Sequence, residues 1–574
     1  MKELLAVARG EKLADFVVKG ARVANVFTLE YEEVDVAVFG DRIAGLGENY
    51  EGKSVIDGSG QVLIPGLIDG HVHIESTLLA PFVFADQVAL HGTTAVMADP
   101  HEIANVLGVK GVEYMYLASR GLPVDVFLGA PSCVPASNFE SAFDDLDMDD
   151  IRTMFDRGWC QHLGEVMNFP GVIAGNPELW GKIKAAVGAP LTGHAPSLSG
   201  KELCAYIASG ISSDHESTDW EEAQEKLRRG MWLMMREGTS SPDLRRLLPL
   251  VKINPALSSR CMVVSDDVTA KALVQKGHMD EKIRIMIREG LDPLVALRMV
   301  TLSPASYFGL KDRGAIGPGR LADMVLVKNL EDCEPLTVWK SGIPVVKDGK
   351  LCRKSVSCVS YAEFRTNTPE NLPIDPSLLA VFAPEGAEMN VIGVEEGYIL
   401  TRKLTMKPLL RSGQVFPDVE RDIAKVVVQE RHRGSGRFSV GFVTGFGMSK
   451  GAIASSVAHD AHNFVVVGVD DLSIATALAY LAKYDGGLVV TSGSEVLGNF
   501  DLPVAGLMST LNALVAAKAL DTLEEKARLL GVRIAHPFMT LSFLCLSVIP
   551  ELKITDRGYV DITKGESTPL FTIR

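Results

Sequence analysis

The sequence has no paired cysteines and no long apolar segment. Its eight cysteines are scattered singly without a CxxC pair, which in a large unsecreted chain indicates reduced, buried thiols. The run TLSFLCLSVI, at residues 540–549, is too short to span a bilayer. The first 18 residues alternate charged and apolar residues and lack the apolar core of a signal peptide. We therefore expect a soluble, cytoplasmic protein with no membrane partner.

An excess of basic residues is also missing. The formal charge is −15 at pH 7 and no basic stripe is visible, which argues against a nucleic-acid partner. The composition, with 47% hydrophobic and 22% charged residues, is typical of a compact globular protein. A chain of 574 residues is too long for one ordinary core, so two to four domains are expected.

Two β-rich segments lie far apart in the sequence. Short strand-like runs separated by turn residues fill about residues 15–62, and a similar pattern returns in residues 314–350. Because these segments flank a long middle region, we predict one small β-sandwich built from residues 1–64 and 313–360.

The middle region, residues 65–312, alternates apolar strand-like runs with helical patterns. Eight such runs over roughly 250 residues are the pattern of a (β/α)8 TIM-like barrel. They are GLIDGHVHIES, GTTAVMADP, VDVFLGAPSCVP, GWCQHLGEVMN, PLTGHAP, ISSDHES, MWLMMREGTS and RCMVVSDDV. Their beginnings are apolar and their ends are rich in polar residues, as expected where catalytic residues gather at the C-terminal face of a barrel. No convincing GxGxxG opens a helix, which disfavours an open doubly wound sheet.

A third unit follows the β-sandwich. The polar, proline-bearing segment after Tyr361 predicts a linker. Residues 375–574 then mix strand-like runs such as NFVVVGVD with helical patterns such as DLSIATALAYLAKY. We predict an additional C-terminal α/β domain, so the fold class of the whole chain is α/β.

The most informative motif is His71-x-His73, at the end of the first predicted barrel strand. Side chains at i and i+2 of a strand point to the same face, so both imidazoles can reach one metal ion. Ligand-type residues also end the fourth, fifth, sixth and eighth strands. The complete set of predicted metal ligands is His71, His73, Glu165, His194, His215 and Asp266. This exceeds the three protein ligands usual for one catalytic zinc, so we predict two divalent ions that share a carboxylate.

Each predicted ligand also has a structural interpretation. His194 and His215 could be hydrogen-bonded structural histidines, and Glu165 could be a salt-bridge partner at the barrel mouth. Asp266 could instead cap the following helix, with Asp267 as its substitute in the ligand role. The occurrence of six such residues at strand ends, in barrel order, favours the metal site.

Further polar residues follow the second and seventh strands. Asp99 could cap a helix, while His101 or Glu102 could face the site as a proton shuttle or a ring contact. Glu237 and Ser240 could contact a substrate ring, although Glu237 could equally form an ion pair with Arg236 or another cation.

A polar group in the C-terminal domain contains His459, Asp460, His462 and Asn463. It could be a further metal site. We favour instead that it packs a turn or reaches across to close the barrel mouth.

These motifs resemble the amidohydrolase superfamily. The resemblance covers about residues 15–350 and rests on PGLIDGHVHIES, the single histidines after strands five and six, SDD after strand eight and GAIGPGRLADMVLV. Within it, HVHIESTLLAP, DPHEIANVLG, GEVMNFP, SDHEST and VSDDVTAKALVQKGHMD look like the adenine deaminases. VAHDAHNFVVVGVDD resembles the extra domain of those enzymes, so the likeness spans nearly the full length.

Two departures from common patterns bear on the chemistry. Many binuclear superfamily members bridge their metals with a carboxylated lysine after strand four, whereas Glu165 stands there in this chain. A glutamate can bridge directly, so a binuclear site is retained. The H-x-E and P-C-x-x-C zinc signature of cytidine deaminases is missing, so base deamination would proceed on an unrelated scaffold.

The resemblance implies hydrolytic deamination of adenine to hypoxanthine and ammonia, as in purine salvage. A hydroxide bridging two divalent ions would attack C6, with Asp266 accepting its proton. The predicted catalytic residues are Asp266, Glu165 and Glu102, and the predicted substrate contacts are His101, Glu237 and Ser240. Imidazole and carboxylate ligands suit manganese or iron better than magnesium, and zinc is possible; the resemblance favours Mn2+ and a homodimer.

Two other functions stay open at this point. One is another cyclic amidohydrolase, similar to a dihydroorotase or a hydantoinase, which would hydrolyse a ring amide. The other is a non-catalytic scaffold, which should have lost metal ligands, although none is missing here.

Overall fold

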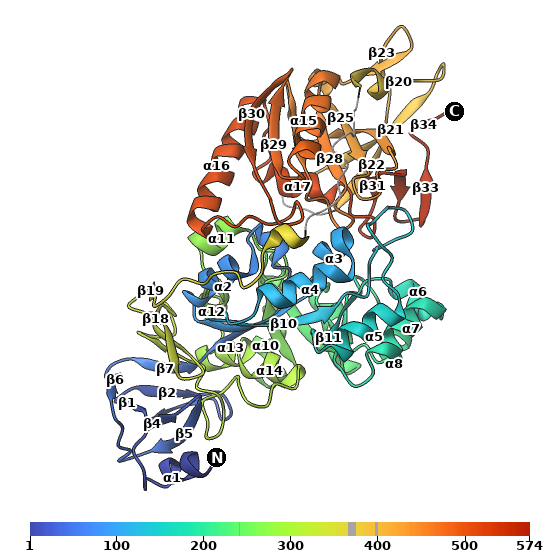
Figure 1. Cartoon of the computed structure of the whole chain (residues 1–574). Helices are drawn as coiled ribbons and strands as arrows, with labels where there is room; N and C mark the ends of the chain where they lie inside the picture. The colour runs from blue at the N-terminus through green and yellow to red at the C-terminus, as the bar shows by residue number, and fades with distance from the viewer. Residues whose placement is uncertain (240, 365–374, 396–399, 574) are drawn as a thin grey trace.

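The computed structural model describes residues 1–239, 241–364, 375–395 and 400–573. Figure 1 shows three parts in a row: the β-sandwich at one end, the barrel in the middle and the C-terminal domain at the other end. This arrangement confirms the predicted fold class, while the residue limits assigned to the domains remain predictions.

The barrel contains the eight predicted strands. They are β8 (Leu67–Val72), β9 (Thr93–Ala98), β10 (Asp125–Ala130), β11 (Cys160–Val166), β12 (Leu191–Gly193), β13 (Ser213–Asp214), β14 (Trp232–Arg236) and β15 (Cys261–Val264). Two parallel sheets, ordered β12-β11-β10-β9-β8 and β13-β14-β15, make up the wall. β12 contacts β13, and Val72 pairs in parallel with Asp266 just beyond β15. The sheet therefore closes on itself.

Helices surround the strands, so the strands are buried on both faces and read as continuous apolar runs. β8, β9 and β15 are buried over their whole length. The helices of this part are α2 (Pro81–Ala89), α3 (His101–Leu107), α4 (Val109–Ala118), α5 (Met148–Asp156), α6 (Phe169–Ile173), α7 (Pro177–Ala185), α8 (Gly200–Ala208), α9 (Trp220–Arg228), α10 (Leu244–Ile253), α11 (Ala270–Gln275), α12 (Met279–Arg288), α13 (Pro293–Met299) and α14 (Leu302–Tyr307).

The β-sandwich is composite, as predicted. Its strands are β1 (Phe16–Lys19), β2 (Arg22–Asn25), β3 (Glu30–Glu33), β4 (Asp35–Phe39), β5 (Arg42–Gly47), β6 (Val55–Asp57), β7 (Val62–Pro65), β16 (Met324–Val327), β17 (Pro335–Lys340), β18 (Ile343–Lys347) and β19 (Lys350–Leu351), preceded by α1 (Lys2–Ala8). β7 pairs with β16 antiparallel, which joins the two β-rich segments in one sheet. Phe16 and Trp339 stack between the sheets with centroids 6.0 Å apart. The β-sandwich thus encloses a core of its own.

The C-terminal domain is built on one large, mainly antiparallel sheet. Its order is β22-β21-β26-β25-β28-β27-β29-β30, with β34 also paired to β21. The bounds are β21 (Glu388–Val394), β22 (Thr401–Met406), β25 (Ile423–Gln429), β26 (Phe438–Thr444), β27 (Ala452–Ser455), β28 (Phe464–Gly468), β29 (Leu488–Ser492), β30 (Glu495–Phe500) and β34 (Phe571–Thr572). The other strands and the α-helices are β20 (Val381–Phe382), β23 (Leu409–Arg411), β24 (Gln414–Phe416), β31 (Leu552–Thr555), β32 (Gly558–Asp561), β33 (Glu566–Thr568), α15 (Asp471–Lys483), α16 (Ala513–Leu529) and α17 (Pro537–Phe543). The predicted linker after Tyr361 falls largely outside the described residues.

The C-terminal domain packs over the mouth of the barrel (Figure 1). α16 lies against α11, and the Ser509 N–H donates to the Leu78 carbonyl oxygen at 2.8 Å. The Ser141 hydroxyl of the barrel donates to the Asp556 carboxylate at 2.7 Å. These contacts place C-terminal residues next to the strand ends.

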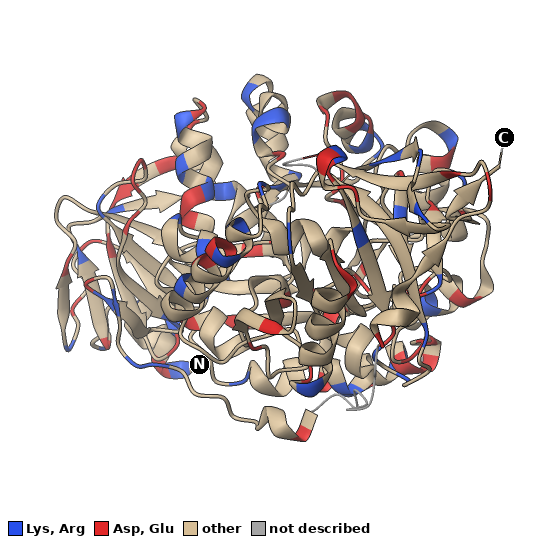
Figure 2. Cartoon of the chain, turned by 90° about the horizontal axis from the view of Figure 1, so that it is seen from above, with Lys and Arg blue, Asp and Glu red and all other residues tan. Residues whose placement is uncertain are grey.

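Two further observations concern the helices and the distribution of charged residues. No described helix is both long enough and apolar enough to cross a membrane. Viewed from above, basic and acidic residues are interspersed along the ribbon (Figure 2).

Candidate active site

The six predicted ligands lie together at the C-terminal ends of the barrel strands. We call them the barrel cluster: His71, His73, Glu165, His194, His215 and Asp266. All six side chains are buried. The barrel brings them together because the carboxyl ends of its parallel strands meet at one face.

One half of the barrel cluster contains the His71-x-His73 pair. The Asp266 Oδ1 atom lies 3.5 Å from His71 Nε2 and 3.2 Å from His73 Nε2. Glu165 Oε1 lies 3.9 Å and 3.3 Å from the same two nitrogens. Two imidazoles and two carboxylates therefore face one point.

The other half contains the two single histidines. Glu165 Oε2 lies 2.8 Å from His194 Nδ1 and 3.1 Å from His215 Nε2. The two oxygens of Glu165 thus face two different pairs of imidazoles, which is the arrangement of a bridging carboxylate.

The orientation of two rings fits metal ligation. His73 Nδ1 donates to the Asp99 carbonyl oxygen at 3.1 Å, so Nε2 is the nitrogen that faces the cluster. His71 Nε2 is buried and has no hydrogen-bond partner among the described residues. Lone pairs on buried nitrogens beside carboxylates suit a divalent cation, so the donor set fits the two predicted ions.

The electrostatics of the two carboxylates agree with this role. Burial would raise the pKa of Glu165, but the surrounding imidazoles, His215 foremost, hold it well below its usual range. Burial likewise opposes ionisation of Asp266, and His71, His73 and Arg236 hold its pKa well below its usual range. Both groups are therefore carboxylates near neutral pH.

Two helix-cap interpretations from the sequence are wrong. The N-cap residue of α3 is Pro100, and Asp99 instead accepts the backbone N–H of Glu165 at 2.7 Å. The N-terminus of α11 is capped by the Thr269 side chain, which leaves Asp266 free for the cluster. Both aspartates follow barrel strands, and neither side chain caps a helix.

Arg236 and Glu216 lie beside the cluster, and Glu216 was not anticipated from the sequence. The Arg236 guanidinium contacts Glu216, and lies 3.0 Å from Asp243 and 3.4 Å from Asp266. Glu216 Oε1 is 3.5 Å from His215 Nε2. The position of Glu216 directly after a strand-end histidine was the signal that could have pointed to it.

The other predicted substrate contacts have different outcomes. His101 lines the cavity at the cluster, with its Nδ1 atom 3.5 Å from Glu165 Oε1. Glu237 does not line that cavity, and its carboxylate lies 3.3 Å from Arg245, which is the ion-pair alternative. Ser240 lies outside the described residues. Asp267 accepts the Ser76 hydroxyl at 2.5 Å and lines the same cavity as the barrel cluster.

Glu102 is held by the C-terminal domain. Its Oε1 atom lies 2.7 Å from His459 Nδ1, and its Oε2 atom contacts His462 Nε2. We call Glu102, His459 and His462 the interdomain cluster. In the structure these histidines reach across to the barrel mouth, which is one of the arrangements expected from the sequence.

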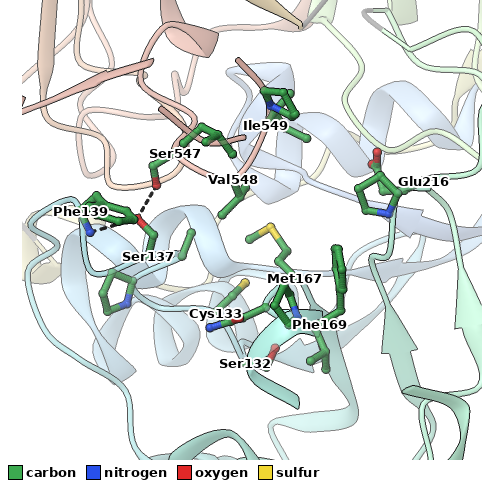
Figure 3. A pocket seen from close by; sticks show the side chains of 18 of the residues that line it. Ser132, Cys133, Ser137, Phe139, Met167, Phe169, Glu216, Ser547, Val548 and Ile549 are labelled. Carbon is green, nitrogen blue, oxygen red and sulfur yellow. Dashed lines mark hydrogen bonds between the residues drawn. The ribbon is translucent and has the colours of Figure 1, made fainter. Parts of the chain in front are cut away.

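Two neighbouring cavities lie at the barrel cluster. The inner one, of about 50 Å³, is bounded by cluster residues and by Phe543, Leu546 and Ile549 of the C-terminal domain. It shares Met167 and Ile549 with an outer cavity of about 1180 Å³. Figure 3 shows Ser547, Val548 and Ile549 facing the barrel side of the outer cavity, with Ser137 hydrogen-bonded to Ser547. Both domains therefore form the walls.

The comparisons with known proteins cover both halves of the chain. Residues 62–351 match the amidohydrolase family, and residues 398–566 match the adenine deaminase C-terminal domain. An adenine deaminase of Desulfatibacillum aliphaticivorans is 44% identical over 571 residues, with 99% of each chain covered. This chain belongs to the adenine deaminase family.

Other relatives agree with this assignment. An adenine deaminase of Dehalococcoides mccartyi is 43% identical and covers 99% of each chain. Among solved structures, the crystal structure of dihydropyrimidinase from Brevibacillus agri is similar with a TM-score of 0.46 at 15% identity. The match covers 59% of this chain and 96% of that chain. Membership of the amidohydrolase family, together with the clusters of His, Asp and Glu, implies binding of divalent metal.

Proposed function

We propose that the protein hydrolyses adenine to hypoxanthine and ammonia. The observation that carries the proposal is Glu165, whose two oxygens face two separate pairs of histidines. Full-length similarity to adenine deaminases supports adenine as the substrate.

The barrel cluster would hold two divalent ions. His71, His73 and Asp266 would hold one, His194 and His215 the other, and Glu165 would serve both. Such ions lower the pKa of bound water and so supply a nucleophile at neutral pH. We propose Mn2+, since imidazole and carboxylate ligands suit it, with Fe2+ or Zn2+ as alternatives.

Asp266 would accept a proton and return it. Its Oδ2 atom lies 3.4 Å from Arg236, whose charge favours the carboxylate form and fixes its orientation. The proton accepted by Asp266 must reach the leaving amine, because amide ion is not a viable leaving group. His101, which lines the same cavity, is a second group for that transfer.

The purine would lie between the cluster and an apolar wall. Met167, Leu546 and Ile549 line the inner cavity together with the charged groups. A flat aromatic ring can pack on this wall while its amine-bearing carbon faces the carboxylates. The inner cavity is small, so the ring would extend toward the outer cavity, which is the route of entry.

The decisive test is ammonia release by the purified, manganese-loaded protein. We expect release from adenine and no hydrolysis of hydantoin or dihydroorotate. Hydrolysis of a ring amide without ammonia from adenine would establish another cyclic amidohydrolase. A preparation that binds no divalent ion and stays inactive after manganese addition would establish the scaffold.

Two further proposals concern the state of the protein. We propose a homodimer, on the resemblance noted above, and a cytoplasmic location, on the eight scattered, unpaired cysteines. Light scattering of the purified protein measures its mass directly, and a monomer's mass would contradict the dimer.

A further inference from the structure

The interdomain cluster joins a loop of the C-terminal domain to the barrel. Its three side chains, Glu102, His459 and His462, are all buried. They could hold a metal ion by residue type alone, since their ligand atoms lie close together. The hydrogen bonds around His462 decide between a metal ligand and a hydrogen-bond donor.

The tautomer of His462 is assigned by its own backbone loop. The Ala458 N–H donates to His462 Nδ1 at 3.1 Å, so that nitrogen carries a lone pair. Burial lowers the pKa of His462 to about 4, which keeps the ring neutral at pH 7. The single ring proton is therefore on Nε2, which donates to Glu102. A protonated Nε2 has no lone pair for a metal, so His462 is a donor.

His462 is itself held from several sides. Its carbonyl oxygen accepts the Arg431 Nε–H at 2.6 Å, and Arg431 is buried. The neighbouring Asn463 donates to the Ser141 carbonyl oxygen of the barrel at 2.9 Å. His462 also has a φ of 55°, an uncommon conformation for a non-glycine residue. The surrounding fold thus specifies the position of the ring.

Glu102 connects this loop to the barrel cluster through His101. His101 Nε2 lies 3.5 Å from Glu102 Oε1, and His101 Nδ1 lies 3.5 Å from Glu165 Oε1. The His101 ring centroid is 4.6 Å from that of His73. A line of contacts therefore runs from His462 through Glu102 and His101 to the predicted bridging carboxylate.

We propose that His462 is a positioning residue for the hydrolytic reaction: its Nε2–H holds Glu102 in the orientation that directs His101 toward the barrel cluster. The inference rests on the proposed function. It assigns a role to the C-terminal domain, which completes the active site from outside the barrel. Groups that orient a functional histidine in this way typically change activity by about 10- to 100-fold when removed.

The test is a mutant cycle in the full-length, metal-loaded protein. His462→Leu removes the donor, whereas His462→Gln places an amide N–H near the position of Nε2. We expect His462→Leu to lower kcat by about 10- to 100-fold with little change in KM, and His462→Gln to stay near wild type. In a Glu102→Ala background, His462→Leu should have no further effect. His536→Leu, an exposed histidine of the same domain, is the control.

Two outcomes of the cycle would overturn the inference. One is an equal loss from His462→Leu with and without the Glu102 carboxylate, which would indicate a purely structural role. The other is a His462→Gln variant as impaired as His462→Leu. Unchanged metal content across the cycle is part of the expected result.

A second readout does not depend on catalysis. In the metal-free protein, the His462 Nε2–H should give a downfield, slowly exchanging proton NMR signal that is lost in His462→Gln and in Glu102→Ala. Without that signal the inference fails even if adenine is hydrolysed. If the signal is present but wild type releases no ammonia from adenine, the proposed function fails and the assigned hydrogen bond stands.

Discussion

The barrel cluster and the interdomain cluster contain the same residue types in different states. Both are buried and combine imidazoles with carboxylates. In the barrel cluster the outer ring nitrogen of His73 donates its N–H to a backbone oxygen, which leaves Nε2 as the nitrogen that would bind a cation. In the interdomain cluster His462 accepts at its outer nitrogen and directs a proton inward. The partner of the second ring nitrogen therefore separates a metal ligand from a hydrogen-bond donor.

The origins of the two clusters differ as well. The barrel cluster comes from strand ends of one domain, which the barrel topology brings together. The interdomain cluster needs a loop of the C-terminal domain to meet α3. Three predictions test whether the two clusters differ in this way.

The largest effect is expected for Glu165→Ala. The bridging carboxylate serves both predicted ions, so its loss should reduce adenine turnover by about 10³-fold or more and reduce bound metal. Metal quantitation and ammonia release on the same sample measure both. Glu221→Ala, an exposed acid on α9, is the control. A Glu165→Ala protein with near-normal turnover would refute the ligand assignment.

An intermediate effect is expected for His459→Ala. Its ring contacts Glu102 and stacks on Phe543, with centroids 4.9 Å apart, so its loss should lower turnover by about 10-fold while bound metal stays unchanged. His71→Ala, by contrast, should lose metal. If both variants lost metal equally, the two clusters would not differ in the way described.

The smallest effect concerns a third histidine–carboxylate contact, outside both clusters. Asp280 is buried, yet His91 and Arg284 lower its pKa from 3.8 to about 2. Because the folded-state pKa is the lower one, the stabilisation is present above about pH 4 and is lost as pH falls toward 2. Asp280→Asn should therefore lower the free energy of unfolding by about 2 kcal/mol at pH 7 and by progressively less below pH 4.

Urea denaturation at several pH values measures this difference. Asp156→Asn, on the exposed side of α5, should stay near wild type throughout. A loss for Asp280→Asn that is equal at pH 7 and pH 3 would point to packing rather than to ionisation.

The sequence pattern predicted the position of a side chain correctly where local structure alone determines that position. The eight barrel strands were predicted because each is a continuous apolar run with polar residues at its end. Glu237 shows the limit of that reasoning, since it also follows a strand but turns toward Arg245. Glu216 directly follows a predicted ligand and was still overlooked, because nothing local shows that Arg236 will bind it.

The sequence alone was sufficient for the barrel, the composite β-sandwich and the convergence of the six predicted ligands, because strand periodicity and barrel order place those side chains on one face. The contact of Glu102 with His459 and His462 depends on tertiary structure, as does the position of Leu546 and Ile549 at the cluster. These residues are separated by hundreds of positions, and their contacts depend on how two domains dock. The way in which two domains dock depends on packing over a whole surface, and a short sequence motif does not predict it.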